Sequence, residues 1–561
     1  MKKTAIIVLL MTVVWVRAGA QTMYDAYRFS ENNYEGTART MAMGNAFTAL
    51  GGDLGSVNIN PAGSAVARYS QFSFSPGVAV SVNKSGGTSP DYFSRAYSTS
   101  SAGFTMPGIG FTINCDTHSY SGIKNVTFGF VVNKTNNYRD NLYTGGLNSS
   151  TSISGAMATL AAGIDYKDLE LTDTYDPYYD SSIPFDVILG YESGIISNIW
   201  NDKGTTDTSD DLIYNGDYAG IAENYYYNPE TGEVDFGSIG LDGNSIYQIY
   251  SRKTSGYKYD YVFNIAANIS DVVYIGANLG ITSLSYGQEY YIRERSGGDA
   301  SDYDLFQTQF NSLKYSYSYN ASGTGVYGKF GIIVTPGKGL RFGAAIQTPT
   351  ATSIRERWQA SAEMTTYSDS YGNGEAETPE SKYDYRLSSP FRFNIGAAYT
   401  FGKFAVISAD YEMADYSRMR IKTADSNDNS EFDPLNSDIR ELMGTSHMFR
   451  AGIEIKPVSC FSVRAGYGLT TSPEKYYDGD MIKKVKSSSS RFSAGVGYSS
   501  SGSFFLDFAV QATKYASEYI YPYDYYALNG NDVVIDPRIE TPEILSKRWL
   551  LNAVLTFGFR F

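Results

Sequence analysis

The sequence predicts an all-β protein, a transmembrane antiparallel β-barrel of about fourteen strands. Three observations support this prediction. Apolar and polar residues alternate through most of the chain, the connections between predicted strands are alternately very short and long, and the last strand runs to the final residue. The composition agrees, because a tyrosine- and glycine-rich chain of modest hydrophobicity suits many strands.

The final strand shows the alternation most clearly. Its last residues, LTFGFRF, place apolar side chains on one face and small or polar side chains on the other. A period of two with such unlike faces indicates a strand between two different solvents. A charge on a lipid-facing position costs about 2–4 kcal/mol, which explains why the arginines keep to one parity. We therefore expect lipid outside and a polar lumen inside, with lumen-facing Arg392, Asp410, Glu412, Arg450, Glu454, Arg464, Arg491, Asp507 and Arg560, and lipid-facing Phe393, Phe492, Phe559 and Phe561.

The connections fix the architecture. From the fourth strand onward, each turn of a few residues alternates with a long loop. Short turns on one rim and long loops on the other are typical of an outer-membrane barrel. The predicted strands are 70–83, 103–114, 124–136, 257–269, 272–291, 313–335, 338–358, 382–401, 404–421, 446–456, 459–472, 489–500, 503–517 and 547–561.

The first 20 residues predict a secretory signal peptide. Two lysines precede an apolar run that ends in Ala18-Gly19-Ala20, with cleavage expected before Gln21. A buried N-terminal strand or helix is the alternative. No cysteine follows the cleavage site, so a lipoprotein anchor is not expected.

Residues 21–68 precede the first strand and carry a small-residue motif. The segment contains Gly44-Asn45-Ala46, Gly52-Asp53 and Asn60-Pro61-Ala62. Small residues allow close packing against a wall, and Pro61 biases Asn60 toward extended backbone. With the signal peptide, the barrel and the terminal phenylalanine, this motif resembles the hatch of the FadL/TodX (OMPP1-type) family of outer-membrane transporters. The hatch and the stretch YDSSIPFDVILGYESG look like Bacteroidetes-type members.

The resemblance implies a passive transporter of hydrophobic compounds, most simply long-chain fatty acids. The implied route is capture at the outer loops, passage past a hatch inside the barrel (21–68), and sideways exit through the barrel wall (69–561). It further implies no cofactor, contacts with outer-membrane lipid and the barrel-assembly machinery, and a monomer. Two alternatives remain open: a shuttle or docking protein of type IX secretion, and a haemin-binding receptor. For residues 21–68, a simple N-terminal cap helix is the alternative to a plug.

The second and third strands contain the weak points expected of such an exit. Pro107 cannot donate a ladder hydrogen bond, and Gly108 allows the strand to bend. Gly129 lies between two phenylalanines on the next strand. We expect unpaired backbone groups near 105–110 and 127–131; the alternative is that Pro107 only tilts the strand end.

Residues 137–256 form the longest predicted insert, on the outer side. Within it, Ile153, Met157, Leu160 and Ile164 recur at helical spacing. We expect an amphipathic helix that captures ligand at the surface, or else an ordinary helix packed inside a folded loop.

The end of the chain predicts an assembly signal. Phe557, Phe559 and Phe561 share one face of the last strand, and the resemblance implies that the assembly machinery recognises the terminal aromatic residue.

Other functions find little support in the sequence. The net charge of -14 argues against nucleic acid as a partner. The two histidines, His118 and His447, are placed in an inner turn and on an outward position, where neither serves a catalytic serine or zinc. The stretch 425–433 alternates oxygen-bearing residues but lacks the glycine of an EF-hand loop, so we expect a solvated acidic loop. We therefore expect no enzyme activity.

Overall fold

The computed structural model describes residues 22–201, 212–228, 233–297, 305–368, 371–424, 430–478, 481–500, 503–529 and 532–561. The predicted signal peptide (1–20) and most of the acidic stretch 425–433 lie outside these residues.

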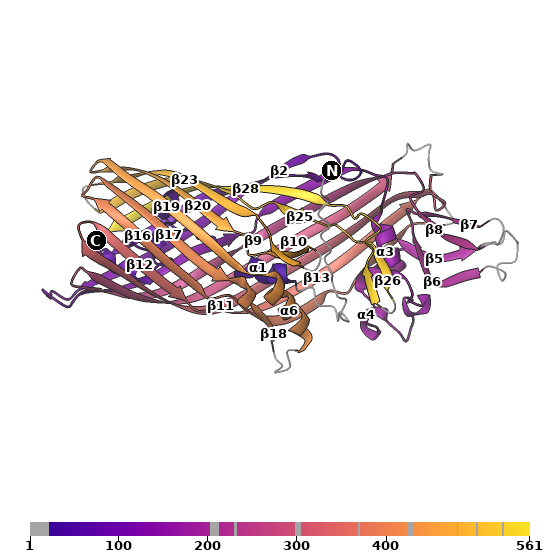
Figure 1. Ribbon diagram of the computed structural model, residues 1–561, viewed down its shortest axis with the longest axis horizontal. Coiled ribbons are helices and arrows are strands. Elements are labelled where there is room, and N and C mark those ends of the chain that lie inside the picture. The colour runs from indigo at the N-terminus through magenta and orange to yellow at the C-terminus, as the bar shows by residue number, and fades with distance from the viewer. Residues whose placement is uncertain are drawn as a thin grey trace.

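The described chain forms a closed antiparallel barrel whose wall has fourteen strand positions (Figure 1). Several positions are built from two consecutive strands. In order around the wall they are β1 (Gln71–Gly87), β2 (Tyr97–Asp116), β3 (Ile123–Asn137) with β4 (Asp140–Asn148), β9 (Ile246–Ile269), β10 (Val273–Ser296), β11 (Phe310–Gly337), β12 (Leu340–Gln347) with β13 (Ala351–Thr366), β16 (Arg392–Phe401) with β15 (Ser381–Ser388), β17 (Ala405–Asp415) with β18 (Arg420–Thr423), β19 (Thr445–Val458), β20 (Phe461–Thr471), β23 (Ser488–Ser499), β24 (Phe504–Lys514) with β25 (Glu518–Ile520), and β28 (Ile544–Arg560).

The last strand closes the barrel against the first. β28 pairs with β24 on one side and with β1 on the other. At the end of this seam, Phe561 and Ser70 exchange two backbone hydrogen bonds of 3.0 Å. Pairing of the last strand with the first leaves neither of them as a free edge toward lipid. The predicted fold class is confirmed.

The two faces of the wall differ as the alternation predicts. Phe492, Phe559 and Phe561 are 50%, 48% and 72% exposed on the outside, and Phe393 is half-buried. The predicted lumen charges are buried, from Arg392 to Asp507. Arg560 is half-buried, with its guanidinium 4.6 Å from the Phe505 ring centroid. An apolar exterior around a polar interior is the pattern of a barrel surrounded by lipid.

The strands on the outer side are longer than the sequence predicts. The predicted insert (137–256) is narrower, because β4 and the outer half of β9 pair with each other over nine positions at its two ends. The wall thus continues beyond the apolar belt, and tyrosine-rich alternation in this part was not recognised as strand. The remaining insert, 149–245, is called the cap below.

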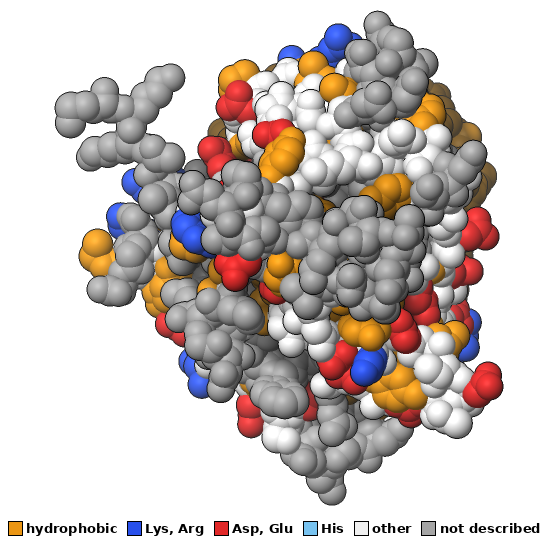
Figure 2. Space-filling view, turned by 90° about the vertical axis from the view of Figure 1, so that its right-hand side faces the viewer, with side chains coloured by type: hydrophobic (Ala, Val, Ile, Leu, Met, Phe, Trp, Pro, Cys, Tyr) orange, Lys and Arg blue, Asp and Glu red, His pale blue; other side chains and the backbone are white. Residues whose placement is uncertain are grey.

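The cap is a small folded unit at the outer end of the barrel (Figure 1). It has its own apolar core, which joins the outer ends of β10, β11 and β13. Figure 2 looks onto this end, where acidic and apolar side chains are interspersed over the described surface. Its elements are α3 (Ile153–Ala161), η3 (Tyr166–Asp168), α4 (Pro177–Asp180), α5 (Phe185–Glu192), β5 (Ile196–Asn201), β6 (Leu212–Gly220), β7 (Asn224–Tyr227) and β8 (Val234–Gly240).

Short elements decorate the other loops and the N-terminal segment. The loops carry β14 (Gly374–Glu377), η6 (Tyr416–Arg418), η7 (Ser430–Phe432), α6 (Asp433–Leu442), β21 (Lys475–Asp478), β22 (Met481–Lys484), β26 (Tyr526–Asn529) and β27 (Asp532–Ile535). The N-terminal segment carries α1 (Met23–Ser30), α2 (Ala38–Ala42), η1 (Leu54–Ser56) and η2 (Pro61–Val66). None of the described helices is long and apolar enough to cross a membrane.

Candidate functional site: the hatch and the interrupted wall

The N-terminal segment before β1 lies inside the barrel. α2 packs against β20, β23, β24 and β28, while η2 packs against β3, β9, β10 and β11. Asn60, Ala62 and most of their neighbours are buried. Of the predicted hatch (21–68), residues 31–66 contain the elements that contact strands on two sides of the barrel interior. The name hatch is used for these residues below.

Glycines on the wall allow the hatch backbone to approach closely. A Cβ atom added at Gly331 would lie 1.9 Å from the Oδ1 of Asn60, and one at Gly343 would lie 2.0 Å from the Thr48 carbonyl oxygen. Further inward glycines on β10, β16, β19, β20 and β23 meet the hatch in the same way, at Gly276, Gly396, Gly452, Gly466 and Gly495. Alternation along a strand predicts which residues face inward, but it carries no information about contact with a distant segment.

Asn60 joins the hatch to the wall. Its Nδ2 donates to the Thr48 carbonyl within the hatch (2.6 Å) and to the Ile332 carbonyl on β11 (3.1 Å). Its Oδ1 accepts from the Ala62 N–H, which starts the short helix that Pro61 opens. Asn60 therefore fixes the conformation of its own turn and the position of that turn on the wall.

The other motif residues shape the hatch turns. Gly44 and Asn45 have φ of 63° and 61°, and Gly52 has φ of 72°, all in the left-handed region. Asn45 donates to the Tyr34 carbonyl (2.7 Å). Asp53 accepts from Thr37 Oγ1 (2.5 Å) and caps the turn at Gly55. Ala46 is fully buried. The motif thus stabilises a compact fold of the hatch.

Buried charges attach the hatch to the opposite wall. Arg39 of the hatch pairs with Glu454 on β19 (2.9 Å), and Glu454 also binds Arg464 on β20 (2.6 Å). The Oδ2 of Asp410 accepts from both the N–H and the hydroxyl of Thr48, each at 2.8 Å. Buried ion pairs need such additional hydrogen bonds to offset their desolvation. The inner lumen is accordingly ionic and closely packed.

The outer lumen is aromatic instead. α1 packs its apolar face, including Ala26 and Phe29, into a cluster with Tyr286, Tyr319 and Trp358 from the wall. The Arg28 guanidinium lies 4.9 Å from the Tyr286 ring centroid. α1 therefore fills an apolar space that faces the outer loops, where it also contacts α6.

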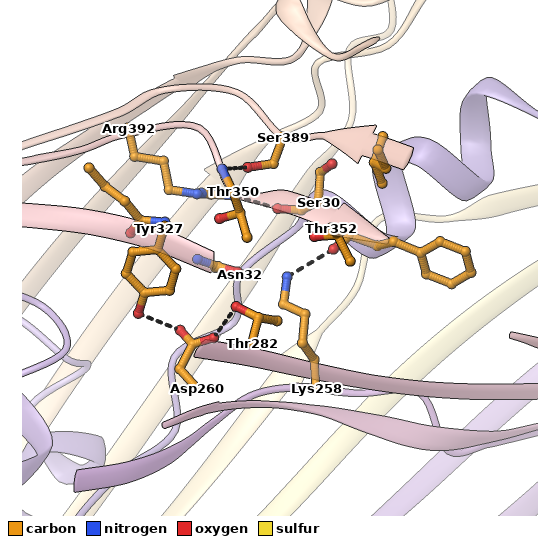
Figure 3. A pocket seen from close by; sticks show the side chains of 13 residues that line it. Ser30, Asn32, Lys258, Asp260, Thr282, Tyr327, Thr350, Thr352, Ser389 and Arg392 are labelled. Carbon is orange, nitrogen blue, oxygen red and sulfur yellow. Dashed lines mark hydrogen bonds between the residues drawn. The ribbon is translucent and has the colours of Figure 1, made fainter. Parts of the chain in front are cut away.

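A polar cavity marks the boundary between these two halves of the lumen (Figure 3). Its two cations are bound by successive backbone carbonyls of the N-terminal segment. Lys258 Nζ donates to the carbonyls of Phe29 (3.0 Å) and Glu31 (2.6 Å), and Arg392 donates to that of Ser30 (2.6 Å). Phe29 and Leu387 line the same cavity, so it has an apolar side and a charged side. The charged side also includes Asp260, and Arg392 pairs with Glu412 (3.2 Å).

The wall is interrupted beside the hatch. The β2–β3 ladder runs from Asp116↔Asn125 to Gly108↔Asn133 and ends there. On its other side, β2 passes a bulge against β1 that contains Pro107. The break lies at the predicted Pro107–Gly108. Gly129 lies elsewhere, because it pairs regularly with Thr112, and the free part of β3 begins at Lys134 instead of within 127–131.

The hatch occupies the edge of β3 that β2 leaves free. The N–H groups of Asn33 and Glu35 donate to the carbonyls of Thr135 (2.6 Å) and Lys134 (2.9 Å). Here β3 bends inward, since all residues from Val131 to Tyr138 are buried. We call residues 33–35 the strap. The pairing of the strap with β3 is a tertiary contact, and no local sequence pattern predicts it.

Beyond Gly108 no ladder joins β2 to β3 in the described wall, and individual contacts bridge the two sides. Nearer the outer end, the Arg95 N–H donates to the Gly145 carbonyl (3.3 Å) and the Thr99 hydroxyl donates to the Asn141 carbonyl (2.5 Å). The hydroxyl of Tyr259 on β9 reaches over β3 to the Met106 carbonyl (3.2 Å), and Lys134 Nζ binds Thr105 Oγ1 (2.9 Å). Side-chain contacts of this kind can break without loss of the barrel ladder.

The predicted capture helix is present as α3, but its apolar face is buried inside the cap and is not exposed to solvent. Ile153 and Met157 are buried in the cap core, and Leu160 and Ile164 pack against it. Glu294 on β10 fixes the helix by accepting from the Ile153 N–H (2.8 Å) and the Ser152 hydroxyl (2.6 Å). This corresponds to the alternative of an ordinary packed helix, because the rest of the cap covers the face that capture would need.

The histidines take no part in this site. His118 is exposed in the inner turn, and the ring of His447 lies 2.8 Å from the Tyr411 hydroxyl on the outer side of the wall. Among the described residues, no group of His, Cys, Asp and Glu side chains could hold a metal ion.

Comparisons with known proteins give structural similarities at low sequence identity. No protein-family model and no curated protein matches the chain. The toluene transporter TodX of Pseudomonas putida is similar with a TM-score of 0.45 and 12% identity, covering 94% of this chain and 99% of that chain. The toluene transporter TbuX of Ralstonia pickettii (TM-score 0.43, 14% identity) and a FadL homologue of Pseudomonas aeruginosa (0.46, 10%) each cover 94% of this chain and 99% of their own. These TM-scores are low, so the fold described above rests on the strand pairing of this chain itself.

Proposed function

We propose that this chain is a passive outer-membrane transporter of hydrophobic molecules, of the FadL/TodX type that its hatch motif resembles. The observation that carries the proposal is the interrupted β2–β3 ladder beside the strap. It lies where the lumen changes from aromatic to ionic. A hydrophobic molecule that enters from the outer loops meets charge and a hatch ahead of it, and a weak wall at its side.

The energetics favour a sideways exit. Each CH₂ kept out of water is worth about 0.8 kcal/mol, so an acyl chain of about fifteen CH₂ groups gains roughly 12 kcal/mol by entering lipid instead of the periplasm. Passage straight through would also require breaking the Arg39–Glu454 pair and the Thr48–Asp410 bonds. Neither transfer into lipid nor diffusion needs a cofactor.

We further propose long-chain fatty acids as the ligand class. An acyl chain fits the aromatic space that α1 fills, and a carboxylate fits Lys258 and Arg392 at its end. A carboxylate would replace the carbonyls of residues 29–31, which bind these cations in the structure. Charge-assisted bonds to a carboxylate are stronger than bonds to neutral carbonyls. Ligand binding and release of the N-terminal segment are thereby coupled.

A reversible disulfide between the strap and β3 tests the gate. The side-chain amides of Asn33 and Asn136 lie 3.5 Å apart, so both are changed to cysteine, with the exposed Cys115 and Cys460 changed to serine. Uptake of labelled fatty acid by cells is expected to fall to background under oxidation and to recover on reduction. The control disulfide, Ala465→Cys with Ala494→Cys, joins two exposed, outward-facing positions on strands that are already paired, and it leaves uptake unchanged.

Two outcomes would contradict the proposal. Undiminished uptake with the strap crosslink formed would exclude exit through this interruption. Wild-type protein that neither takes up fatty acid nor retains lipid, but binds a secreted protein tightly, would favour the shuttle.

A further inference from the structure

One flank of the barrel exposes a group of lysines above its apolar belt. Lys84 on β1, Lys514 on β24 and Lys547 on β28 are exposed and face outward. The outer halves of β20, β23, β24, β28, β1 and β2 carry no outward-facing acidic residue within the described chain. We call these three residues the lysine patch. None of them forms an ion pair with a described residue. Glu543, directly before β28, lies beyond the patch and accepts from the Tyr521 hydroxyl (2.5 Å).

The remaining wall is different. Its outward charges are mixed in sign, and some pair across strands, as in Arg355–Asp384 (3.0 Å) and Lys314–Glu363 (3.3 Å). Like charges also face each other there, at Arg386 and Lys422, but with acidic residues on the same part of the wall. The chain as a whole carries a net charge of -14. An unpaired basic cluster on an acidic protein is therefore a local feature and does not follow from composition.

The strand register brings the lysines together. Lys84 and Lys547 are direct cross-strand partners, and Lys514 pairs with Trp549, one step further in on the same face of β28. Like charges that face each other across two strands are destabilising unless an anion lies between them. The register thus creates a site with high positive potential and no protein counter-ion.

The position of the lysine patch along the barrel axis indicates which part of the membrane it contacts. Val82 and Trp549 are partners in the register position just below Lys84 and Lys547, and below them the outward positions stay apolar to Phe559. Tryptophan at the end of an apolar belt is typical of the membrane interface. The patch therefore lies at the level of lipid headgroups, on the side of the barrel that carries the cap.

We propose that the lysine patch binds the phosphate groups of an anionic glycolipid in the outer leaflet. Phosphate is the headgroup chemistry that lysine recognises as a compact charge, and three nearby lysines suit a headgroup with more than one phosphate. The site lies on the lipid-facing exterior. It is separate from the hatch and the lumen. The proposal therefore does not depend on which ligand the lumen carries.

The test uses the full mature chain in detergent micelles and lipid A as the probe. Binding is measured by native mass spectrometry for the wild type, for Lys84→Gln/Lys514→Gln/Lys547→Gln, and for the control Lys253→Gln/Lys338→Gln/Lys403→Gln, which removes the same charge from exposed lysines elsewhere. We expect the patch variant to bind at least about tenfold more weakly. The control variant should match the wild type, and dephosphorylated lipid A should not bind.

Several results would overturn the proposal. Equal binding by the patch variant, or equal loss in the control, would mean that no specific site exists. Binding of dephosphorylated lipid A as strong as that of lipid A would exclude phosphate recognition. Competition by inorganic phosphate at equal concentration would assign the site to a free anion. If the triple variant does not fold, Lys84→Gln and Lys547→Gln are measured singly, and each should weaken binding by about threefold.

Discussion

The side chain of Asn60 hydrogen-bonds both the hatch and the barrel wall. We predict that Asn60→Ala with Pro61→Ala lowers fatty-acid uptake while the barrel stays folded. The variant leaves the Thr48 and Ile332 carbonyls without their donor, a loss of about 1–3 kcal/mol that falls on the hatch alone. Uptake of labelled ligand and protease sensitivity of the hatch are the measurements.

Ser56→Ala is the matched control for this variant. Ser56 is an equally buried hatch residue whose hydroxyl donates to the Asp53 carbonyl within the hatch (2.6 Å). It leaves the bonds between the hatch and the wall in place, so it should change uptake less. Unchanged uptake in the Asn60 variant would reduce the motif to a structural role.

Glu223 makes the cap sensitive to pH. Burial raises the pKa of this carboxyl from 4.5 to about 7, and the Gly220 N–H offsets only part of that cost. Because the folded cap binds the proton more tightly than the unfolded chain does, the stabilisation by the protonated carboxyl is complete below pH 4.5 and is lost as the pH rises toward 7. The cap should therefore be less stable at about pH 8.5 than at about pH 5.5, by up to about 2 kcal/mol.

Limited proteolysis of the cap in wild type and in Glu223→Gln measures this dependence. Comparing both proteins at each pH removes the pH response of the protease. Glu223→Gln keeps the size of the side chain and cannot ionise, so its cap should lose less resistance between the two pH values than the wild-type cap does. The remaining response comes from other buried carboxyls, among them Glu294, which bonds α3 in both proteins. A wild-type cap that is equally resistant at both pH values would contradict the prediction.

At the scale of elements, alternation predicted which strand residues face lipid. It did not predict which wall residues contact the hatch. Strand faces such as Phe559 against Arg560 could be assigned from sequence because a lipid-facing charge is costly. The contact of Gly331 with Asn60 could not, since a glycine at an inward position looks the same whether it meets water or a distant segment. The bend of β3 at Lys134 was missed for the same reason, because the strap that accompanies it lies about a hundred residues earlier in the chain.

The C-terminal strand carries a prediction of its own. Deleting Phe561 should lower the amount of folded protein in the outer membrane, because it removes both the terminal aromatic side chain and the two hydrogen bonds that finish the seam with Ser70. Heat-modifiable mobility of membrane fractions measures folded barrel. Phe104→Ala removes an outward ring of similar exposure (74% against 72%) from another strand and should leave the yield unchanged. Normal yield after deletion would exclude an assembly role.

At the scale of the whole molecule, the lumen is two chambers joined at one cavity. The outer chamber is lined with aromatic rings and filled by α1, and the inner one is filled by the hatch and its ion pairs. Lys258 and Arg392 both line the cavity at the junction. Lys258 lies on β9, the strand next to β3, and Arg392 lies further around the wall at the start of β16. This arrangement makes the N-terminal segment a competitor of the ligand, since both need the same apolar space and the same two cations.

We predict that deleting residues 22–30 strengthens ligand binding in the outer chamber by about tenfold or more, because ligand no longer has to displace α1. Trp358 lies in this chamber and reports occupancy when a brominated fatty acid quenches its fluorescence. Trp549→Phe removes the lipid-facing tryptophan that the same probe would reach from outside.

If the ligand is an acid, its affinity for the outer chamber should also depend on Lys258 at the junction. In the shortened chain, Lys258→Gln should weaken quenching by a brominated fatty acid but not by a brominated hydrocarbon, because only the acid has a carboxylate for the cation. Identical quenching curves for the full and shortened chains would show that α1 does not occupy the ligand site. Equal weakening of both probes by Lys258→Gln would show that the cation supports the chamber without selecting an acid.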